Sequence, residues 1–272
     1  MSAVNAAITT AFDYFFAPFA ANPWLGMVVI SFVTGFVLLF IFRFTSNQRG
    51  IRATKDRIMA HLLEVLLYKD ELGLVLRAQG RIFANNFRYL GYALVPLACM
   101  IIPVAVLLVQ TELRYGHRPL RVGEEAIVAV KVRSNATSLD ELSLSAPNGI
   151  EVETAALRMP AAKEVDWRIR AAAPGNHSLR ISVGGEKFTK QVVVGEGSSR
   201  ISLQRVGAGD WEQLLHPGEI PLPKDGAVVL IKVSYPGASL PILGTQVHWV
   251  WAWLILSMAF GFAFKGPLRV QV

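Results

Sequence analysis

The chain has 272 residues, of which 53% are hydrophobic and 17% charged, and its formal net charge is +7. This composition is too apolar for an ordinary soluble protein and predicts a membrane protein with a sizeable polar domain. Residues 43–88 hold nine basic and four acidic residues, whereas residues 111–246 hold sixteen and fifteen. Such a distribution is typical of membrane topology and of contact with membrane lipids, and it argues against a nucleic-acid partner.

Residues 1–23 are predicted to form an interfacial aromatic segment. The segment contains no Lys or Arg, so it lacks the basic start of a typical signal peptide. Aromatic side chains gather at residues 12–19, as in a short helix that lies in the membrane interface. A frayed hydrophobic terminus is the alternative interpretation.

The first predicted transmembrane helix covers residues 24–42, which carry no charge. A helix of this length crosses roughly 30 Å of hydrocarbon, and Trp24 is suited to the headgroup region at its start. Arg43 and Arg49 follow directly. Because basic residues concentrate on the cytoplasmic side, the N-terminus is expected outside.

Residues 43–88 are predicted to form a cytoplasmic basic helical hairpin. Apolar residues recur at spacings of three and four on both sides of Tyr68–Glu71, the most polar point, where we expect the turn. The hairpin either projects into the cytoplasm or lies on the membrane surface. One long bent helix is a further possibility.

Two more transmembrane helices are predicted, at residues 89–110 and 247–264, which are also uncharged. Pro96 and Pro103 favour kinks in the first of them, since each removes a backbone hydrogen bond. Basic residues in the tail, residues 265–272, place the C-terminus in the cytoplasm.

Residues 111–246 are predicted to form an extracytoplasmic all-β sandwich of the immunoglobulin-like type. Short Val-rich stretches alternate with turn signals, and the length of about 115 residues between positions 118 and 235 suits one such domain. Trp167 and Leu179 are expected in its core, and residues 207–224 are expected to be a loop-rich insertion. Strands are expected at residues 126–132, 141–145, 152–157, 165–171, 178–183, 188–194, 201–204 and 227–233.

No catalytic group of residues is expected. The five histidines are scattered without metal-ligand spacing, and Cys99 is the only cysteine. No charged residue lies within a predicted span, which argues against an ion or proton relay. We therefore predict that the protein is not an enzyme and has no cofactor and no metal site.

The order of the predicted elements resembles the short members of the YidC/Oxa/Get membrane insertase superfamily. These include the core insertase subunit of the endoplasmic reticulum membrane complex and its archaeal relatives. The resemblance is one of topology and covers roughly half of the chain. It is carried by residues 12–19, 24–43, 48–88, 89–110 and 247–264.

The resemblance implies an inner-membrane protein that assists insertion or assembly of other membrane proteins, its clients. Ser31 and Thr34 would then line a shallow groove, and Arg43, Arg49 and Arg52 would attract acidic flanks of a client. Packing of the two hydroxyl residues against another helix is the alternative.

Two other functions fit the same pattern. In one, the chain is a non-catalytic accessory subunit of a larger membrane complex, whose β domain is an extracytoplasmic docking module. In the other, the chain is a sensor whose β domain binds a ligand and signals through the hairpin.

Overall fold

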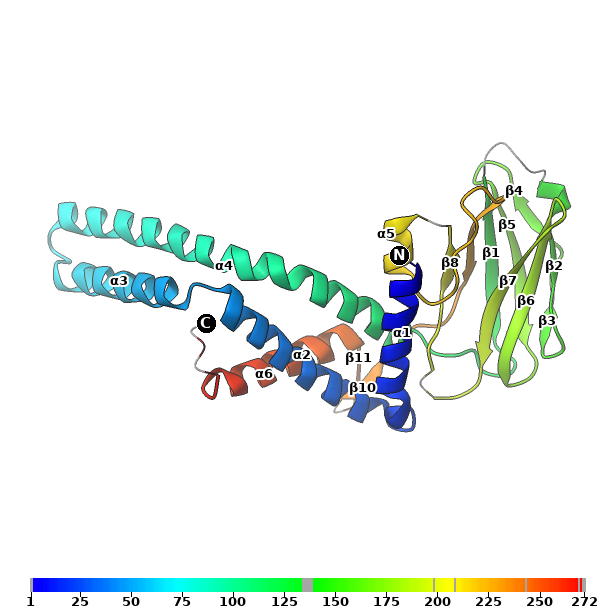
Figure 1. The fold of residues 1–272 in the computed structure, drawn as a ribbon, viewed down its shortest axis with the longest axis horizontal. Helices are drawn as coiled ribbons and strands as arrows, with labels where there is room; N and C mark the ends of the chain where they lie inside the picture. The colour runs from blue at the N-terminus through cyan, green and yellow to red at the C-terminus, as the bar shows by residue number, and fades with distance from the viewer. Residues whose placement is uncertain are drawn as a thin grey trace. The chain divides into compact units, whose positions relative to one another are not determined.

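The computed structural model describes residues 2–133, 139–197, 199–207, 209–242, 244–268 and 270 (Figure 1). Residues 269, 271 and 272 of the predicted tail thus lie outside the described residues. The chain forms two compact units. The first, here called the β unit, comprises Met1–Gly26 and Leu108–Ala252, and the second, the helical unit, comprises Met27–Leu107 and Trp253–Val272.

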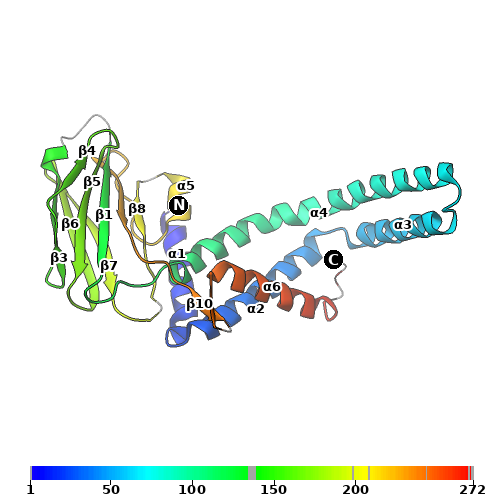
Figure 2. The same ribbon diagram turned by 180° about the vertical axis from the view of Figure 1, so that it is seen from behind.

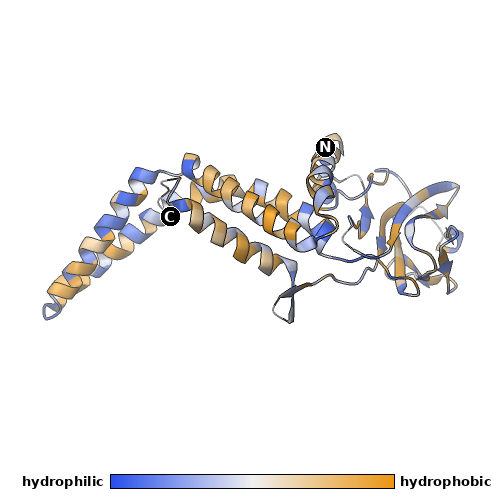
Figure 3. Cartoon of the chain, turned by 90° about the horizontal axis from the view of Figure 1, so that it is seen from below, coloured by the Kyte–Doolittle hydropathy of each residue, from blue (hydrophilic) through white to orange (hydrophobic). Residues whose placement is uncertain are grey.

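Four helices build the helical unit or pass into it: α2 (Pro23–Thr45), α3 (Gln48–Leu67), α4 (Leu72–Tyr115) and α6 (Trp249–Lys265). Within the described chain, α2 and α4 are long and apolar enough to cross a membrane by length and composition, and α6 is a shorter apolar helix of 17 residues. Their apolar character is visible in Figure 3. The membrane crossing of all three predicted spans therefore stays a prediction.

The hairpin forms where the sequence changes from apolar periodicity to polar residues. Asn47 caps α3 because its side chain accepts a hydrogen bond from the backbone N–H of Gly50 at 2.9 Å. Helix α3 ends at Leu67 and α4 begins at Leu72, so the turn falls at the predicted position. The two helices then run side by side in opposite directions (Figures 1 and 2).

Helix α4 corrects the predicted element boundaries. The predicted second arm of the hairpin and the predicted span at 89–110 are one continuous helix of 44 residues, which ends at Tyr115 and not at Gln110. The change from polar to apolar residues near position 88 alters what surrounds a helix without breaking its backbone hydrogen bonds. Pro96 and Pro103 both lie inside the helix.

Helices α2 and α6 pack closely within the helical unit. A Cβ atom placed on Gly35 would lie 2.5 Å from the backbone oxygen of Ser257, so only glycine permits this approach. The ring of Phe32 meets Phe260 and Phe264 edge to face, with centroids 5.4 and 5.3 Å away.

Two antiparallel sheets form the centre of the β unit. One has the strand order β3-β5-β1-β9-β8, with β4 also paired to β5, and the other has the order β2-β6-β7. The strands are β1 (Glu125–Val132), β2 (Ser143–Ser145), β3 (Ile150–Val152), β4 (Leu157–Met159), β5 (Glu164–Ala171), β6 (Gly175–Val183), β7 (Glu186–Val194), β8 (Gln204–Val206) and β9 (Val228–Val233).

Alternating apolar residues turn one face of each sheet toward a shared core. In β1, every second side chain from Ala126 to Val132 is buried, and Val128 lies opposite Trp167 in the register. Trp167 is 4% exposed and Leu179 0%, which confirms both as core residues. Buried residues of the two sheets form one hydrophobic cluster. The β-sheet domain predicted from the sequence is thus present.

Helix α1 (Ser2–Phe16) and the short 3-10 helix η1 (Ala17–Phe19) belong to the β unit and precede α2. The Asn5 amide donates a hydrogen bond to the backbone oxygen of Gln213 in α5 (Asp210–Leu215). Helix α5 lies inside the segment predicted to be a loop.

Three further short elements complete the β unit. A hairpin of β10 (Leu240–Ile242) and β11 (Thr245–Val247) precedes α6, and the 3-10 helix η2 (Leu139–Glu141) precedes β2. The sequence did not predict the β10–β11 hairpin.

Candidate functional site

The five residues predicted to serve a client fall into two environments. Ser31 and Thr34 are 0% exposed, and the indole of Trp253 in α6 donates to the Thr34 hydroxyl at 3.3 Å. This position fits helix packing, the alternative given above for these two residues. Arg43 at the end of α2 and the two arginines at the start of α3, Arg49 and Arg52, are exposed. The structure thus does not bring the hydroxyl residues and the arginines onto one open surface.

Large apolar side chains on the hairpin are exposed. On α3, Leu66 and Leu67 are 72% and 76% exposed, and on the first half of α4, Phe83 and Phe87 are 66% and 72% exposed. Soluble surfaces seldom expose so many large apolar residues together without a binding role. Basic residues share these helices, so the hairpin combines apolar contact area with positive charge.

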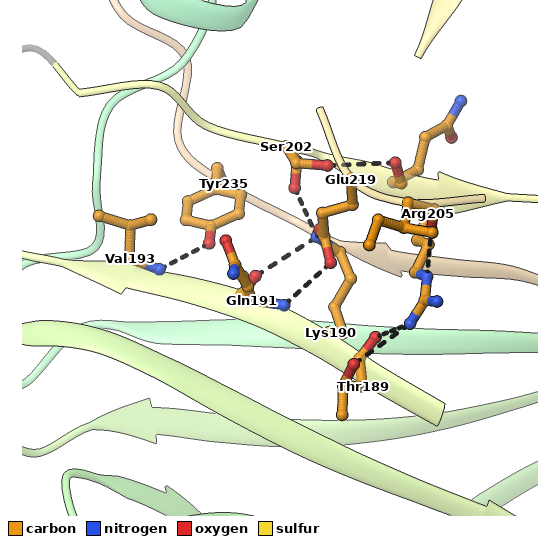
Figure 4. Close-up of polar contacts among 10 residues, drawn as sticks. Thr189, Lys190, Gln191, Val193, Ser202, Arg205, Glu219 and Tyr235 are labelled. Carbon is orange, nitrogen blue, oxygen red and sulfur yellow. Dashed lines mark hydrogen bonds and ion pairs between the residues drawn. The ribbon is translucent and has the colours of Figure 1, made fainter. Parts of the chain in front are cut away.

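A buried ion pair organises one edge of the β unit (Figure 4). Lys190 takes an inward position in β7 between two apolar residues, Phe188 and Val192, and its side chain is 0% exposed. Its ammonium group pairs with the carboxylate of Glu219 and donates to the backbone oxygen of Ser202 at 2.7 Å. Burial lowers the pKa of Lys190, and the charge of Glu219 opposes that shift.

The segment around Glu219 is held to β7 by further polar contacts (Figure 4). The second carboxylate oxygen of Glu219 accepts from the backbone N–H of Gln191 at 3.2 Å. Arg205 in β8 donates to the backbone oxygens of Ile220 and Thr189. Because the carboxylate of Glu219 and the guanidinium group of Arg205 each bind backbone groups, the segment around Glu219 has a defined position against the sheet.

Tyr235 contacts the same strand, β7, near this ion pair (Figure 4). Its buried hydroxyl accepts a hydrogen bond from the backbone N–H of Val193 at 3.0 Å. Burial raises the pKa of Tyr235 to about 12, so the phenol stays protonated at neutral pH.

A second charged cluster joins α1 to α4. Arg114 is 5% exposed, donates to the backbone oxygen of Gln110 at 2.7 Å and pairs with the carboxylate of Asp13. The other oxygen of that carboxylate accepts from Arg200 at 2.6 Å. Asp13 therefore fixes α1 to the end of α4 and to the segment before β8.

The two clusters border one open cavity of about 600 Å³ in the β unit. Its walls come from α1, from β6 and β7, and from residues 216–221. Charged and polar groups at this cavity include Arg200, Arg205, Glu219, Thr189 and Gln191. This size is in the range of pockets that hold small molecules.

His216 is the histidine that lines this cavity. Within the described part of the chain, no group of three or more His, Cys, Asp or Glu residues is placed to hold a metal ion. The amide of Gln204 donates to His216 Nε2, and burial lowers the pKa of His216, so that ring is neutral near pH 7.

Sequence reasoning missed this site because its residues are distant in the chain. Lys190 and Glu219 are 29 positions apart, and Asp13 is 187 positions from Arg200. One signal was present in the sequence: a lysine at an inward position of the alternating strand β7 must find a partner when it is buried.

Comparison with known proteins returned no match: no family model, no curated protein and no solved structure matches the chain.

Proposed function

We propose that the chain is a multi-pass inner-membrane protein that assists the insertion or assembly of other membrane proteins. In this proposal α2, the apolar part of α4 and α6 cross the membrane. The N-terminus is outside, and the hairpin and C-terminus are in the cytoplasm. The β unit carries an immunoglobulin-like sandwich in the periplasm.

One observation carries the proposal: the hairpin exposes apolar side chains beside basic ones. Leu66, Leu67 and Phe87 each expose more than two thirds of their surface, an arrangement suited to transient contact with an apolar client segment. Arg49 and Arg52 at the start of α3 are exposed and would attract the acidic flanks of such a segment. Membrane lipids and client membrane proteins are the proposed partners.

Client insertion into vesicles tests the proposal. A variant with Arg43, Arg49 and Arg52 replaced by Gln should slow insertion, and the loss should be largest at low salt, where charges are least screened. The triple replacement Arg158→Gln, Arg168→Gln and Arg170→Gln is a matched control, because these arginines are on β4 and β5.

A second variant tests the apolar contact. Leu63→Gln with Leu66→Gln should lower insertion at every salt concentration, because it removes exposed apolar area and leaves the charge unchanged. Equal insertion by the wild-type protein, both variants and empty vesicles would reject the insertase proposal.

The second candidate function is a non-catalytic accessory subunit of a larger membrane complex. The exposed apolar surface of α4 favours this role. Only 6% of the apolar stretch of this helix is buried, and Ile101 and Ile102 are 61% and 73% exposed. In the accessory role a partner helix covers this surface, whereas in the insertase role lipid or a client does. Copurification of a stoichiometric partner, together with unchanged insertion, would favour the accessory role.

A further inference from the structure

The cavity in the β unit carries more positive than negative charge. Its charged lining residues in the described chain are Arg200, Arg205 and Glu219. The carboxylate of Glu219 is already paired with the fully buried Lys190. Among the described residues of the lining, neither arginine therefore forms an ion pair with a lining carboxylate.

The cluster behind the lining adds to this excess. Asp13 is shared between Arg200 and the buried Arg114, so one carboxylate serves two cations. Together the two clusters hold four cations and two carboxylates. Arg200 and Arg205 both keep part of their surface exposed, so an anion that enters the cavity can reach both guanidinium groups.

Hydrogen-bond donors point to the same kind of ligand. Arg205 uses Nε and Nη1 for backbone oxygens, and Arg200 uses Nη1 for Asp13. In the described part of the chain, Nη2 of either guanidinium group meets no acceptor. The side chains of Asn5, Thr9 and Gln191 line the same space and can hydrogen-bond oxygens of a ligand.

We infer that this cavity binds a phosphate group, carried by a lipid headgroup or by a small soluble molecule. A phosphate offers several acceptor oxygens and one to two negative charges, which suits a guanidinium fork and its planar pair of donors. The volume of about 600 Å³ leaves room for a polar group attached to the phosphate.

A lipid headgroup is one source because apolar surface continues beside Arg200. A neighbouring cavity of about 140 Å³ is lined by Arg200 together with Phe16 and Phe19, and also by Asp13 and Arg114. A ligand that carries both a phosphate and an apolar part would contact both spaces. The inference goes beyond the proposed function, and only its lipid arm depends on the proposed membrane location.

Calorimetric titration of the protein in dodecyl maltoside, a detergent that carries no phosphate group, tests the inference. The probes are inorganic phosphate, glycerol phosphate and water-soluble short-chain phosphatidylglycerol. Arg205→Gln and Arg200→Gln should each weaken binding roughly tenfold, the expected loss of a charge-assisted hydrogen bond. Arg168→Gln is the matched control, since this arginine on β5 is 54% exposed and pairs with Glu125.

A variant that is expected to tighten binding makes the test independent of folding defects. Asp13→Asn removes a carboxylate, raises the positive charge of the site and should tighten binding, with a steeper dependence on salt. Glycerol phosphate binding as tightly as the short-chain lipid supports the site and a soluble source. Binding of the lipid alone supports the site and a headgroup source.

Two outcomes would overturn the inference. One is the absence of saturable binding of all three probes by protein whose circular dichroism shows it folded. The other is equal affinity in the wild-type protein, Arg200→Gln, Arg205→Gln and Asp13→Asn. Neither result depends on client insertion, so failure of the phosphate site and failure of the insertase proposal are separate findings.

Discussion

The two units place their apolar residues in opposite ways. The β unit buries them among themselves: Val128, Trp167 and Ile231 are at most 4% exposed and belong to one cluster that both sheets share. The helical unit leaves them on the outside, as Leu67 and Ile102 show with 76% and 73% exposure. The β unit therefore closes its own core, whereas the helical unit depends on lipid or protein to cover its surface.

Charged groups show the reverse contrast. The β unit buries Lys190 and Arg114 and supplies carboxylates for them, so ion pairs position its parts. In the helical unit, Arg43, Arg49 and Arg52 are exposed, as the proposed contact with headgroups or clients requires. Substitutions should accordingly affect stability in the first unit and interactions in the second.

The largest expected effect is in the core of the β unit. Trp167→Ala should lower the free energy of unfolding of this unit by roughly 3–5 kcal/mol, because it removes a large buried ring and leaves a cavity. Chemical denaturation followed by near-ultraviolet circular dichroism measures it. Ile127→Ala on the exposed side of β1, where Ile127 is 46% exposed, is the control and should cost much less. Equal losses would show that the two faces of the sheet are not differently buried.

A somewhat smaller effect is expected at the buried ion pair. Glu219→Gln should destabilise the β unit by about 3 kcal/mol, since it leaves Lys190 buried without its counter-charge. The loss should shrink at alkaline pH, because a neutral lysine no longer needs the carboxylate. Denaturation of wild type and variant across pH measures this, and a pH-independent difference would contradict the role of charge. Glu186→Gln at the exposed start of β7 is the control.

Close helix packing predicts an effect in the helical unit. Gly35→Ala should destabilise it by about 2 kcal/mol, because the new Cβ meets the backbone oxygen of Ser257, which cannot easily move. Gly91→Ala is the matched control: nothing lies within 4 Å of its Cβ, so the change should be neutral or slightly stabilising through helix propensity. Thermal unfolding in detergent, followed by helical circular dichroism, compares the two. A stabilised Gly35→Ala variant would contradict the packing of α2 on α6.

The smallest effect concerns the ion pair of Arg118 with Glu124, just before β1. A hydrogen bond from Arg118 lowers the pKa of Glu124 to about 2, below the value of about 4.3 for an unfolded chain. The resulting stability is therefore complete above about pH 4.3 and is lost as the pH falls toward 2. Because both side chains are about 30% exposed, the contribution should be about 1 kcal/mol or less. Acid titration of wild type and Glu124→Gln should show a difference in stability above about pH 4.3 that disappears as the pH falls toward 2, and a difference that persists unchanged down to pH 2 would contradict the assignment.

Local sequence patterns predict the longer strands well and the short ones less well. Strands β1, β5 and β9 lie within a residue or so of their predicted ranges, because their alternating apolar residues face one core. The predicted strand at 201–204 is displaced to Gln204–Val206, and the predicted strand at 152–157 is replaced by the ends of β3 and β4. The sequence predicts a boundary within α4 because polarity changes along it, although no residue near Arg88 interrupts the helix.

Local sequence patterns could not predict the candidate site. The pairs of Lys190 with Glu219 and of Asp13 with Arg200 depend on which distant segments the fold brings together. A sequence identifies such residues as candidates for pairing but does not identify their partners.

In the proposed topology the exposed apolar helices cross a membrane, with the hairpin on one side and the β unit on the other. Lys69 in the hairpin turn and Lys187 at the start of β7 are both exposed, so each can carry a reporter cysteine after Cys99→Ser. Labelling of intact cells with a membrane-impermeant maleimide measures the side. The proposed topology predicts that the Lys187→Cys variant reacts once the periplasm is accessible and that the Lys69→Cys variant reacts only after the inner membrane is permeabilised. Labelling of both variants from the same side would contradict the account.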